Sequence, residues 1–335
     1  MNKSDAILHS RATKRPAFWA RRPIGRLLTN FGVPLALLFT VALFSLLRPA
    51  AFPTWRNLDA ILTLAAPLAV TALGITVVLA QGDLDLSFGS VIGLAGAVTF
   101  VALAEDRWAL AWPVALLGGL LVGALAGAIN GALIAYVGLA PIITTLGMST
   151  ALVGVEFLFT DQQTVYGNVP EAFTQIGRGV WLGLNVQVWL AGLVVLLMYG
   201  LMEQTELGRY FYALGGNREA AHLSGISVKA VRMTGFLISG LAGALTGVLI
   251  VAQSASSSPT AGEPYLLPAL TAAFLGTSMF RQGQFNVLGT TVGVLFLGVI
   301  QTGLIMLHLS TAIINIVQGA VLVTAILVSR FGARP

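Results

Sequence analysis

The clearest candidates for chemistry lie in one short polar segment between two apolar stretches, residues 81–89 with the sequence QGDLDLSFG. If the flanking stretches cross a membrane, an ionised aspartate at the bilayer centre would cost roughly 2.5–3.5 kcal/mol and need compensation. Asp85 or Ser87 has a local use, because either oxygen could cap a helix that begins near Phe88. The segment therefore predicts a capped helix start, with substrate contact and a proton relay as alternatives.

A helix start of this kind would serve transport if it lay beside the path of a solute. The candidates to line that path are Asp83, Asp85, Ser87, Phe88 and Asn130. Further polar residues within apolar stretches are Glu156, Gln253, Gln301, Asn315 and Gln318. Amide side chains can bind hydroxylated solutes, but we favour hydrogen bonds between neighbouring helices for each of them. Interior pairing or solvation is the favoured role of Glu156.

Metal, thiol and phosphate chemistry find no support in the sequence. There is no cysteine, which excludes disulfides and thiolate nucleophiles. The three histidines, His9, His222 and His308, have no metal-ligand spacing. No Gly-x-x-x-x-Gly-Lys-Ser/Thr loop is present, so the chain is not expected to bind or hydrolyse ATP. We predict no catalytic residue, metal site or cofactor in this chain.

The composition indicates a membrane protein. Of 335 residues, 56% are hydrophobic and 9% are charged, whereas a soluble domain carries about 25% charged residues. A spanning helix needs about 20 mainly apolar residues. The segments that meet this need are approximately 29–47, 58–80, 87–104, 110–137, 141–160, 187–203, 233–254, 266–280, 287–307 and 311–329. We predict an all-α polytopic membrane protein with about ten transmembrane helices, forming a single domain over residues 29–330.

The basic residues indicate which side of the membrane each loop faces. Residues 1–28 are strongly basic, which favours a retained cytoplasmic tail over a cleaved signal peptide. With the N-terminus inside, 14 of the 18 Lys and Arg residues lie inside, as the positive-inside rule requires. The others are Arg48, Arg56, Arg107 and Arg178. Both termini and the loop 203–232 are then cytoplasmic, the loop 161–186 is external, and the basic pI does not indicate nucleic-acid binding.

Glycine spacing predicts close helix packing and suggests an internal repeat. Three glycines recur every four residues in the fourth apolar segment: Gly123, Gly127 and Gly131. Small residues at this spacing let helix backbones approach each other in lipid. Residues 88–93 (FGSVIG) are similar to 288–293 (LGTTVG), and transporters often contain repeated halves, although the match determines neither register nor inversion. The polar breaks near 81–87 and 281–286 could lie within the membrane or at its edge.

A polar, basic island separates two apolar runs at residues 203–232. The glycine pair 215–216 is followed by Asn217, a good N-cap for a helix of about two turns, and Gly225 suits a left-handed end. A helix this short must be supported by packing. The alternative is a solvated connector whose arginines only set topology. The alanine pair 220–221 and the bracketing glycines favour docking against a soluble partner.

Together these segments resemble the ribose-type sugar permeases of bacterial ATP-binding-cassette importers, over about residues 40–331. The resemblance rests on Asp85-Leu86-Ser87 with Gly89-Ser90, Asn130-Gly131, Leu207-Gly208-Arg209, Ala213-Leu214-Gly215-Gly216-Asn217, Leu223-Ser224-Gly225-Ile226 and Pro259-Thr260-Ala261-Gly262. In addition, Glu219-Ala220-Ala221 with Gly225 resembles the EAA-x-x-x-G signature of the broader permease class. In that class the signature forms a coupling helix that fits into a cleft of the ATPase.

The resemblance implies a multi-subunit machine in the bacterial inner membrane. Two permease chains, identical or related, would form the path. Cytoplasmic ATP-binding-cassette ATPases would drive it with ATP and Mg²⁺, and a periplasmic binding protein would deliver a monosaccharide or related polyol. The implied coupling residues are Asn217, Arg218, Glu219, Ala220, Ala221 and Gly225. The sugar is not identified, because Asp83 and residues 275–283 depart from the pattern of the ribose permeases.

Two other functions compete with an importer subunit. A stand-alone proton-coupled secondary sugar transporter would use Asp83, Asp85 and Glu156 as proton carriers. A membrane-embedded glycosyl transferase would need catalytic acids or bases that converge at one face, and the chain offers few candidates. The sequence therefore favours a permease subunit that translocates a small sugar or polyol by alternating access.

Overall fold

The computed structural model describes residues 23–281 and 283–332, with side chains from 32 to 281 and from 283 to 324. Most of the basic tail expected over residues 1–28 lies outside these ranges. Within them the chain is almost entirely helical. The α-helices are α1 (Pro23–Leu47), α2 (Trp55–Ala80), α3 (Phe88–Leu103), α4 (Trp112–Ala132), α5 (Pro141–Thr160), α6 (Glu171–Arg178), α7 (Val186–Tyr199), α8 (Glu206–Gly216), α9 (Arg218–Leu223), α10 (Val228–Ser254), α11 (Glu263–Gly276), α12 (Val287–Met306) and α13 (Thr311–Gly332).

Short irregular elements complete the described part of the chain. The π-helical segments η1 (Leu133–Val137) and η2 (Gly200–Gln204) continue α4 and α7. The strands are β1 (Val165–Tyr166), β2 (Val180–Trp181), β3 (Leu184–Asn185) and β4 (Ser256–Ser257). Strand β1 pairs antiparallel with β4, and β2 pairs antiparallel with β3. Each of these two-residue ladders joins neighbouring loop segments, and they form no sheet layer.

Six of the described helices are long and apolar enough to cross a membrane. They are Trp55–Ala80, Trp112–Val137, Pro141–Thr160, Val186–Gln204, Val228–Ser254 and Val287–Met306. The class of all-α polytopic membrane protein is therefore confirmed. The remaining expected segments coincide with α1, α3, α11 and α13, which are not among these six, so the number of ten spans stays a prediction.

Local signals explain where several helices start and stop. Pro141 opens α5, a position where its missing N–H costs nothing. Gly138, with φ +88°, ends η1 in the left-handed conformation that favours glycine. Asn286 caps α12, because its Oδ1 accepts the backbone N–H of Gly289 at 2.7 Å.

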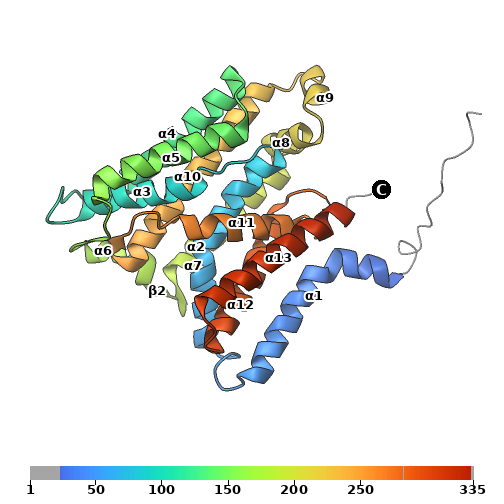
Figure 1. Cartoon of the computed structure of the whole chain (residues 1–335), viewed down its shortest axis with the longest axis horizontal. Coiled ribbons are helices and arrows are strands. Elements are labelled where there is room, and N and C mark those ends of the chain that lie inside the picture. The colour runs from blue at the N-terminus through green and yellow to red at the C-terminus, as the bar shows by residue number, and fades with distance from the viewer. Residues whose placement is uncertain (1–22, 282, 333–335) are drawn as a thin grey trace, which may run out of the picture.

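Helices α2 and α10 form the centre of the molecule. Helix α10 packs against α4, α3 and α2, and α2 also packs against α12, α11 and α7. The principal apolar cluster joins side chains of α2, α3, α7, α10, α11 and α12. In Figure 1, α4 and α5 lie on one side of α2, and α12 and α13 lie on the other. The polar segment after α2 bonds to the α4 side of this arrangement and to α9 and α10.

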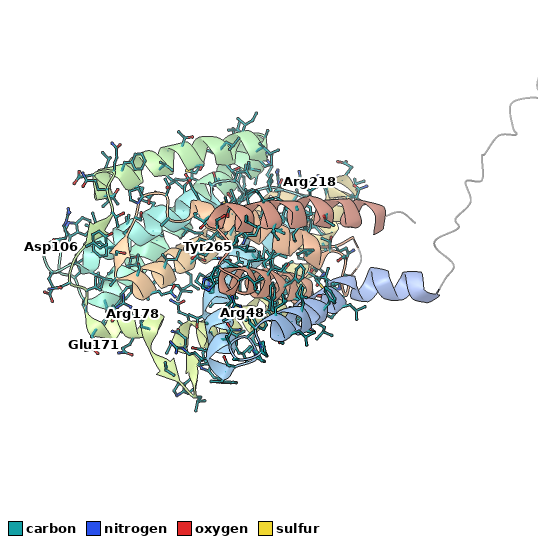
Figure 2. All side chains as sticks on the ribbon, turned by 60° about the horizontal axis from the view of Figure 1, so that its bottom comes forward. Arg48, Asp106, Glu171, Arg178, Arg218 and Tyr265 are labelled. Atoms are coloured by element: carbon teal, nitrogen blue, oxygen red, sulfur yellow. The ribbon has the colours of Figure 1, made fainter. Side chains whose placement is uncertain are left out.

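The outer helices expose apolar side chains. In the 18-residue apolar stretch of each helix that could span a membrane, 17% of the residues of α5 are buried, against 83% of those of α2. Ile143 and Leu158 on α5 are 75% and 82% exposed. Charged side chains instead gather toward the ends, where Figure 2 shows Asp106, Glu171 and Arg178 at one end and Arg218 toward the other. An apolar belt between charged ends suits a bilayer.

The three spaced glycines of α4 face α10. A Cβ at Gly123 would overlap the carbonyl oxygen of Gly240, and one at Gly127 would overlap that of Phe236. A Cβ at Gly131 would meet Met233. The two helix backbones therefore touch along this stripe, which small residues permit in lipid, where van der Waals packing holds helices together.

The two polar breaks lie at the same end of the fold. After α2, Gly82 packs against Gly215 at the end of α8. After α11, Arg281 forms an ion pair of 2.7 Å with Glu203 in η2. The helix pairs α2–α3 and α11–α12 consequently run in the same sense relative to α8, an arrangement that the sequence similarity alone left open.

Candidate functional site

Helix α9 forms where the sequence placed its start and stop. Asn217 Oδ1 accepts the backbone N–H of Ala220 at 2.9 Å, which is an N-cap hydrogen bond. The helix covers only six residues, Arg218–Leu223. Gly225 has φ +84°, and its N–H donates to the carbonyl of His222 at 2.9 Å. The expected cap and the expected left-handed end are both present.

The two alanines of α9 have opposite surroundings. Ala221 is buried and belongs to an apolar cluster with Phe211, Leu214 and Val231. Ala220 is exposed, together with Glu219 and most other residues of the turn. Leu223, at the end of the helix, is 79% exposed. One face of α9 is therefore anchored to α8 and α10, and the other exposes Glu219, Ala220 and Leu223. Figure 1 shows this helix at the edge of the molecule.

Asp83 connects this helix to the interior. Its carboxylate is fully buried and lies 2.6 Å from the guanidinium of Arg218. Arg232, near the start of α10, donates to the same carboxylate at 2.7 and 2.8 Å. Sequence inspection placed Asp83 on a solute path, and this role stays a prediction. The partners that the structure gives it belong instead to the loop 203–232.

Asp85 and Ser87 form a second buried polar group with two neighbouring helices. Asp85 Oδ1 accepts the N–H of Ser87 at 3.0 Å and its hydroxyl at 2.6 Å. Ser239 of α10 donates to Asp85 Oδ2 at 2.9 Å, and Asn130 of α4 donates to Ser87 Oγ at 2.8 Å. The expected capping of α3 by Asp85 or Ser87 is wrong, because neither side chain accepts an N–H of the helix, which begins at Phe88. Asp85 instead bonds to Ser87, the residue before the helix, and the Ser87 oxygen accepts from Asn130.

The proposed path residues are buried in this conformation. Phe88 is fully buried, as are Ser87 and the side chain of Asp83, while Asp85 and Asn130 are 2% and 1% exposed. The described structure places these five in one region, and none of them lines the cavity near the other end of α10 that is described below. Asn130 Oδ1 has no hydrogen-bond partner among the described residues. Their role in solute passage remains a prediction for another conformation.

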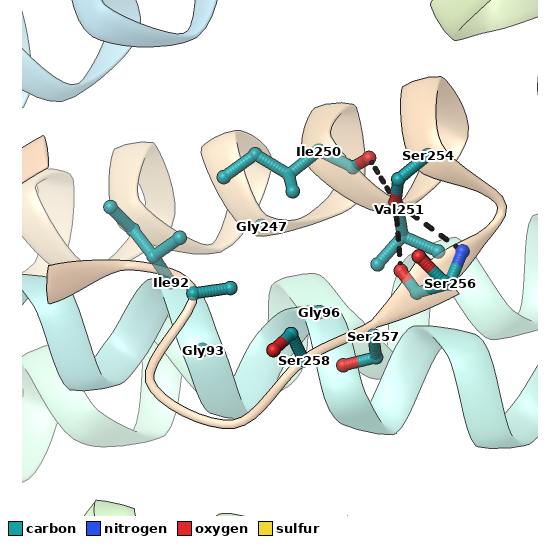
Figure 3. Close-up of a pocket in the computed structure, with 11 residues that line it drawn as sticks. Ile92, Gly93, Gly96, Gly247, Ile250, Val251, Ser254, Ser256, Ser257 and Ser258 are labelled. Atoms are coloured by element: carbon teal, nitrogen blue, oxygen red, sulfur yellow. Dashed lines mark hydrogen bonds between the residues drawn. The ribbon is translucent and has the colours of Figure 1, made fainter. Parts of the chain in front are cut away.

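A small cavity of about 140 Å³ lies toward the end of α10 that is remote from α9. Its lining comprises Ile92, Gly93, Gly96, Gly247, Ile250, Val251, Ser254, Ser256, Ser257, Ser258 and Ala261. Figure 3 shows Ser254 on α10 beside Ile250 and Val251, and Ser256, Ser257 and Ser258 on the segment that follows α10. Sequence inspection missed this serine cluster, because only the tertiary fold brings residues 254–258 beside α3.

Glu156 lies next to this cavity. It is fully buried, its Oε1 accepts the N–H of Thr260 at 3.2 Å, and Oε2 has no partner among the described residues. A Cβ at Gly93 would collide with this carboxylate. The expected interior pairing of Glu156 is therefore seen for one of its two oxygens.

Sequence inspection also missed Arg232 and Ser239, since nothing in the local sequence marks them as partners of Asp83 and Asp85.

Comparisons with known proteins cover nearly the whole chain. The family described as branched-chain amino acid transport system / permease component matches residues 57–326. The ribose import permease protein RbsC of Escherichia coli (strain K12) is 37% identical over 88% of this chain and 91% of that protein. The L-arabinose transport system permease protein AraH of the same strain is 31% identical over 92% of each chain. RbsC of Bacillus subtilis (strain 168) is 34% identical over 90% of this chain and 92% of its own length. No solved structure matches.

Proposed function

The chain belongs to the branched-chain amino acid transport system / permease component family and is a permease subunit of an ATP-binding-cassette importer; we propose that it carries a small sugar or related polyol from the periplasm to the cytoplasm by alternating access. The family description alone would favour amino acids. Relatives that cover most of this chain are named for ribose, D-allose and L-arabinose, and these names support a sugar.

The observation that carries this proposal is the capped, outward-facing helix α9. Its N-cap and its left-handed stop give it a defined position, and Ala220, Glu219 and Leu223 form its exposed face. A short, exposed helix that carries a small residue, an acid and a leucine on its outer face is suited to enter a cleft of a partner. We propose that this partner is a cytoplasmic ATP-binding-cassette ATPase, which would bind ATP and Mg²⁺.

Further parts of the proposal follow from that assignment. The loop 203–232 and both termini would be cytoplasmic, with about ten spans in the inner membrane. A periplasmic binding protein would deliver the solute at the opposite end, and a second permease copy, identical or related, would complete the path. ATP binding would pull the two copies of α9 together. The shift requires that the nucleotide favours one conformation of the complex over the other.

The coupling assignment is tested by a double substitution, Glu219→Arg with Gly225→Pro. Proline cannot adopt the φ of +84° at position 225, and the arginine reverses an exposed charge on the docking face. Uptake of radiolabelled D-ribose, D-allose or L-arabinose into vesicles that contain the chain, its ATPase and its binding protein is expected to fall at least about tenfold. The control is Glu206→Arg, a similarly exposed acid on α8. Undiminished uptake by the double variant would refute the assignment.

The proton-coupled alternative makes a different demand on Glu156. It would need this buried acid, whose Oε2 is unpartnered among the described residues, to gain and lose a proton during transport. Glutamine keeps the shape and the acceptor for Thr260 N–H, and it cannot carry a proton. We expect Glu156→Gln to retain uptake within about twofold, since the ATPase supplies the energy. Loss of uptake in this variant, together with sensitivity to a protonophore, would favour the alternative.

A further inference from the structure

A cluster of three charges around the buried carboxylate of Asp83 joins α9 to the break between α2 and α3. Asp83 Oδ1 accepts from Arg218 at 2.6 Å and from Arg232 at 2.7 Å, so one oxygen serves two guanidinium groups. Asp83 Oδ2 also accepts from Arg232 Nε at 2.8 Å. The cluster holds one negative and two positive charges. Without the carboxylate, two cations would face each other in a poorly solvated place, and attraction would become repulsion.

Arg218 is placed to transmit this attraction to α9. It is the first residue of that helix, and the same Nη2 donates to the backbone carbonyls of Gln81 at 3.3 Å and Gly82 at 3.0 Å. These two carbonyls and the carboxylate of Asp83 all belong to the break after α2. A movement of the start of α9 away from the break would therefore weaken these bonds or force the Arg218 side chain to reorient.

Arg232 extends the connection to two further elements. Its side chain is 13% exposed, and besides Asp83 it donates to the carbonyl of Ile134 in η1 at 3.1 Å. Asp83 thereby links α9, the start of α10 and the end of α4. Two residues later, Asp85 bonds Ser239 of α10 across the same interface. If α9 moved, residues 83–87 would transmit the movement to the start of α3.

From this geometry we infer that Asp83 is a positioning residue that couples α9 to the break between α2 and α3. The inference rests on the proposed function, since it assigns the means by which movement of the ATPase would reach the helices. A structural role alone would require only that Asp83 neutralise Arg232, which is nearly buried. The bonds to the first residue of α9, which is 40% exposed, are what a coupling role adds.

A second ion pair connects the other break to the same loop. Glu203 Oε2 lies 2.7 Å from Arg281, and Glu203 Oε1 accepts from the hydroxyl of Tyr212 at 2.9 Å. Burial, with a contribution from Glu203, raises the pKa of Tyr212, so its hydroxyl remains a donor. In this pair the carboxylate of Glu203 lies in the loop 203–232, and the guanidinium of Arg281 lies in the break after α11. The loop 203–232 thus holds both breaks through buried or half-buried charges.

The test uses the absence of cysteine in the chain, which makes a single introduced cysteine a specific label site. A spin label is attached through His222→Cys, an exposed position on α9, in the full chain in lipid nanodiscs. With Asp83→Asn, we expect the label to become more mobile. In vesicles that contain the Asp83→Asn chain with its ATPase and binding protein, we expect the amount of D-ribose, D-allose or L-arabinose carried per ATP hydrolysed to fall about tenfold.

Two further variants keep the result decisive. Arg218→Gln removes the exposed partner and should loosen the label even if Asp83→Asn fails to fold. Adding Arg218→Gln to Asp83→Asn should change little more, because the pair acts as a unit. The control is Glu206→Gln, which breaks an exposed ion pair of 3.7 Å with Arg209 in the same loop. It should leave mobility and transport unchanged.

The outcomes separate this inference from the proposed function. Unchanged label mobility in both Asp83→Asn and Arg218→Gln would overturn the inference, as would strictly additive effects on transport. Label mobility is measured on the chain alone and needs no substrate. If the unsubstituted complex carried none of the three sugars, the cargo proposal would fail, while the mobility result would still decide whether Asp83 positions α9.

Discussion

Replacing Gly123 with alanine is expected to lower the free energy of unfolding by about 3 kcal/mol, because the contact between α4 and α10 leaves no room for a methyl group. The added Cβ would overlap the carbonyl oxygen of Gly240 and collide with the Cβ of Ala244. The carbonyl is backbone within a helix, so it cannot rotate away. The helices would have to separate, and the packing contacts along the stripe to Gly131 would weaken together.

The matched control lies on the same helix. A Cβ at Gly118 would find Val98 Cγ1 at 3.9 Å, an ordinary contact. Gly118→Ala should therefore be neutral or slightly stabilising, as alanine is the better helix former. Thermal unfolding of the two variants in detergent, followed by the loss of monodisperse protein, measures the difference. Equal melting temperatures for Gly118→Ala and Gly123→Ala would contradict the close approach of α4 and α10.

The second large effect is expected at the junction of α8 and α2. A Cβ at Gly215 would overlap the carbonyl oxygen of Ala80 and lie 3.5 Å from the backbone nitrogen of Gly82. Gly215→Ala should therefore push the end of α8 off the break and misplace Arg218. A cost of about 3 kcal/mol in the coupled conformation corresponds to a loss of uptake of about a hundredfold.

The neighbouring glycine provides the control for this prediction. Gly216 also ends α8, and a Cβ there would have nothing within 4 Å. Gly216→Ala should keep sugar uptake near that of the unsubstituted chain. Uptake in vesicles, normalised to the amount of inserted protein, compares the two. If Gly215→Ala transports as well as Gly216→Ala, then close seating of α8 on the end of α2 is not needed for coupling.

Several elements were predictable because their determinants are local. The stop of α9 depends on Gly225 and its start on Asn217, which caps an N–H three residues away. The apolar segments coincide with helices because a helix pairs its backbone N–H and C=O groups within the segment, as a surrounding of lipid or apolar side chains requires. The glycine stripe of α4 was visible as a spacing of four, although the sequence did not show that α10 is the helix it contacts.

Local inference failed where two nearby groups compete for the same bond. Ser87 was a plausible cap for α3, yet its hydroxyl donates to Asp85 at 2.6 Å. A carboxylate accepts a stronger hydrogen bond than a neutral oxygen, so the serine acts as a donor there. Neither side chain therefore caps α3: the two polar groups bond to each other just before the helix begins, which the order of residues does not specify.

By itself the sequence determined the membrane class, the family and the short helix that we assign to coupling. These rest on composition, on motifs and on caps whose partners lie within four residues. Only the tertiary structure showed which groups Asp83 bonds to, because its partners lie 135 and 149 residues away in the chain. A buried carboxylate must find opposite charge wherever the fold supplies it. Through Asp83 this requirement connects α9 to the helices at the centre of the molecule, and no local sequence pattern predicts the connection.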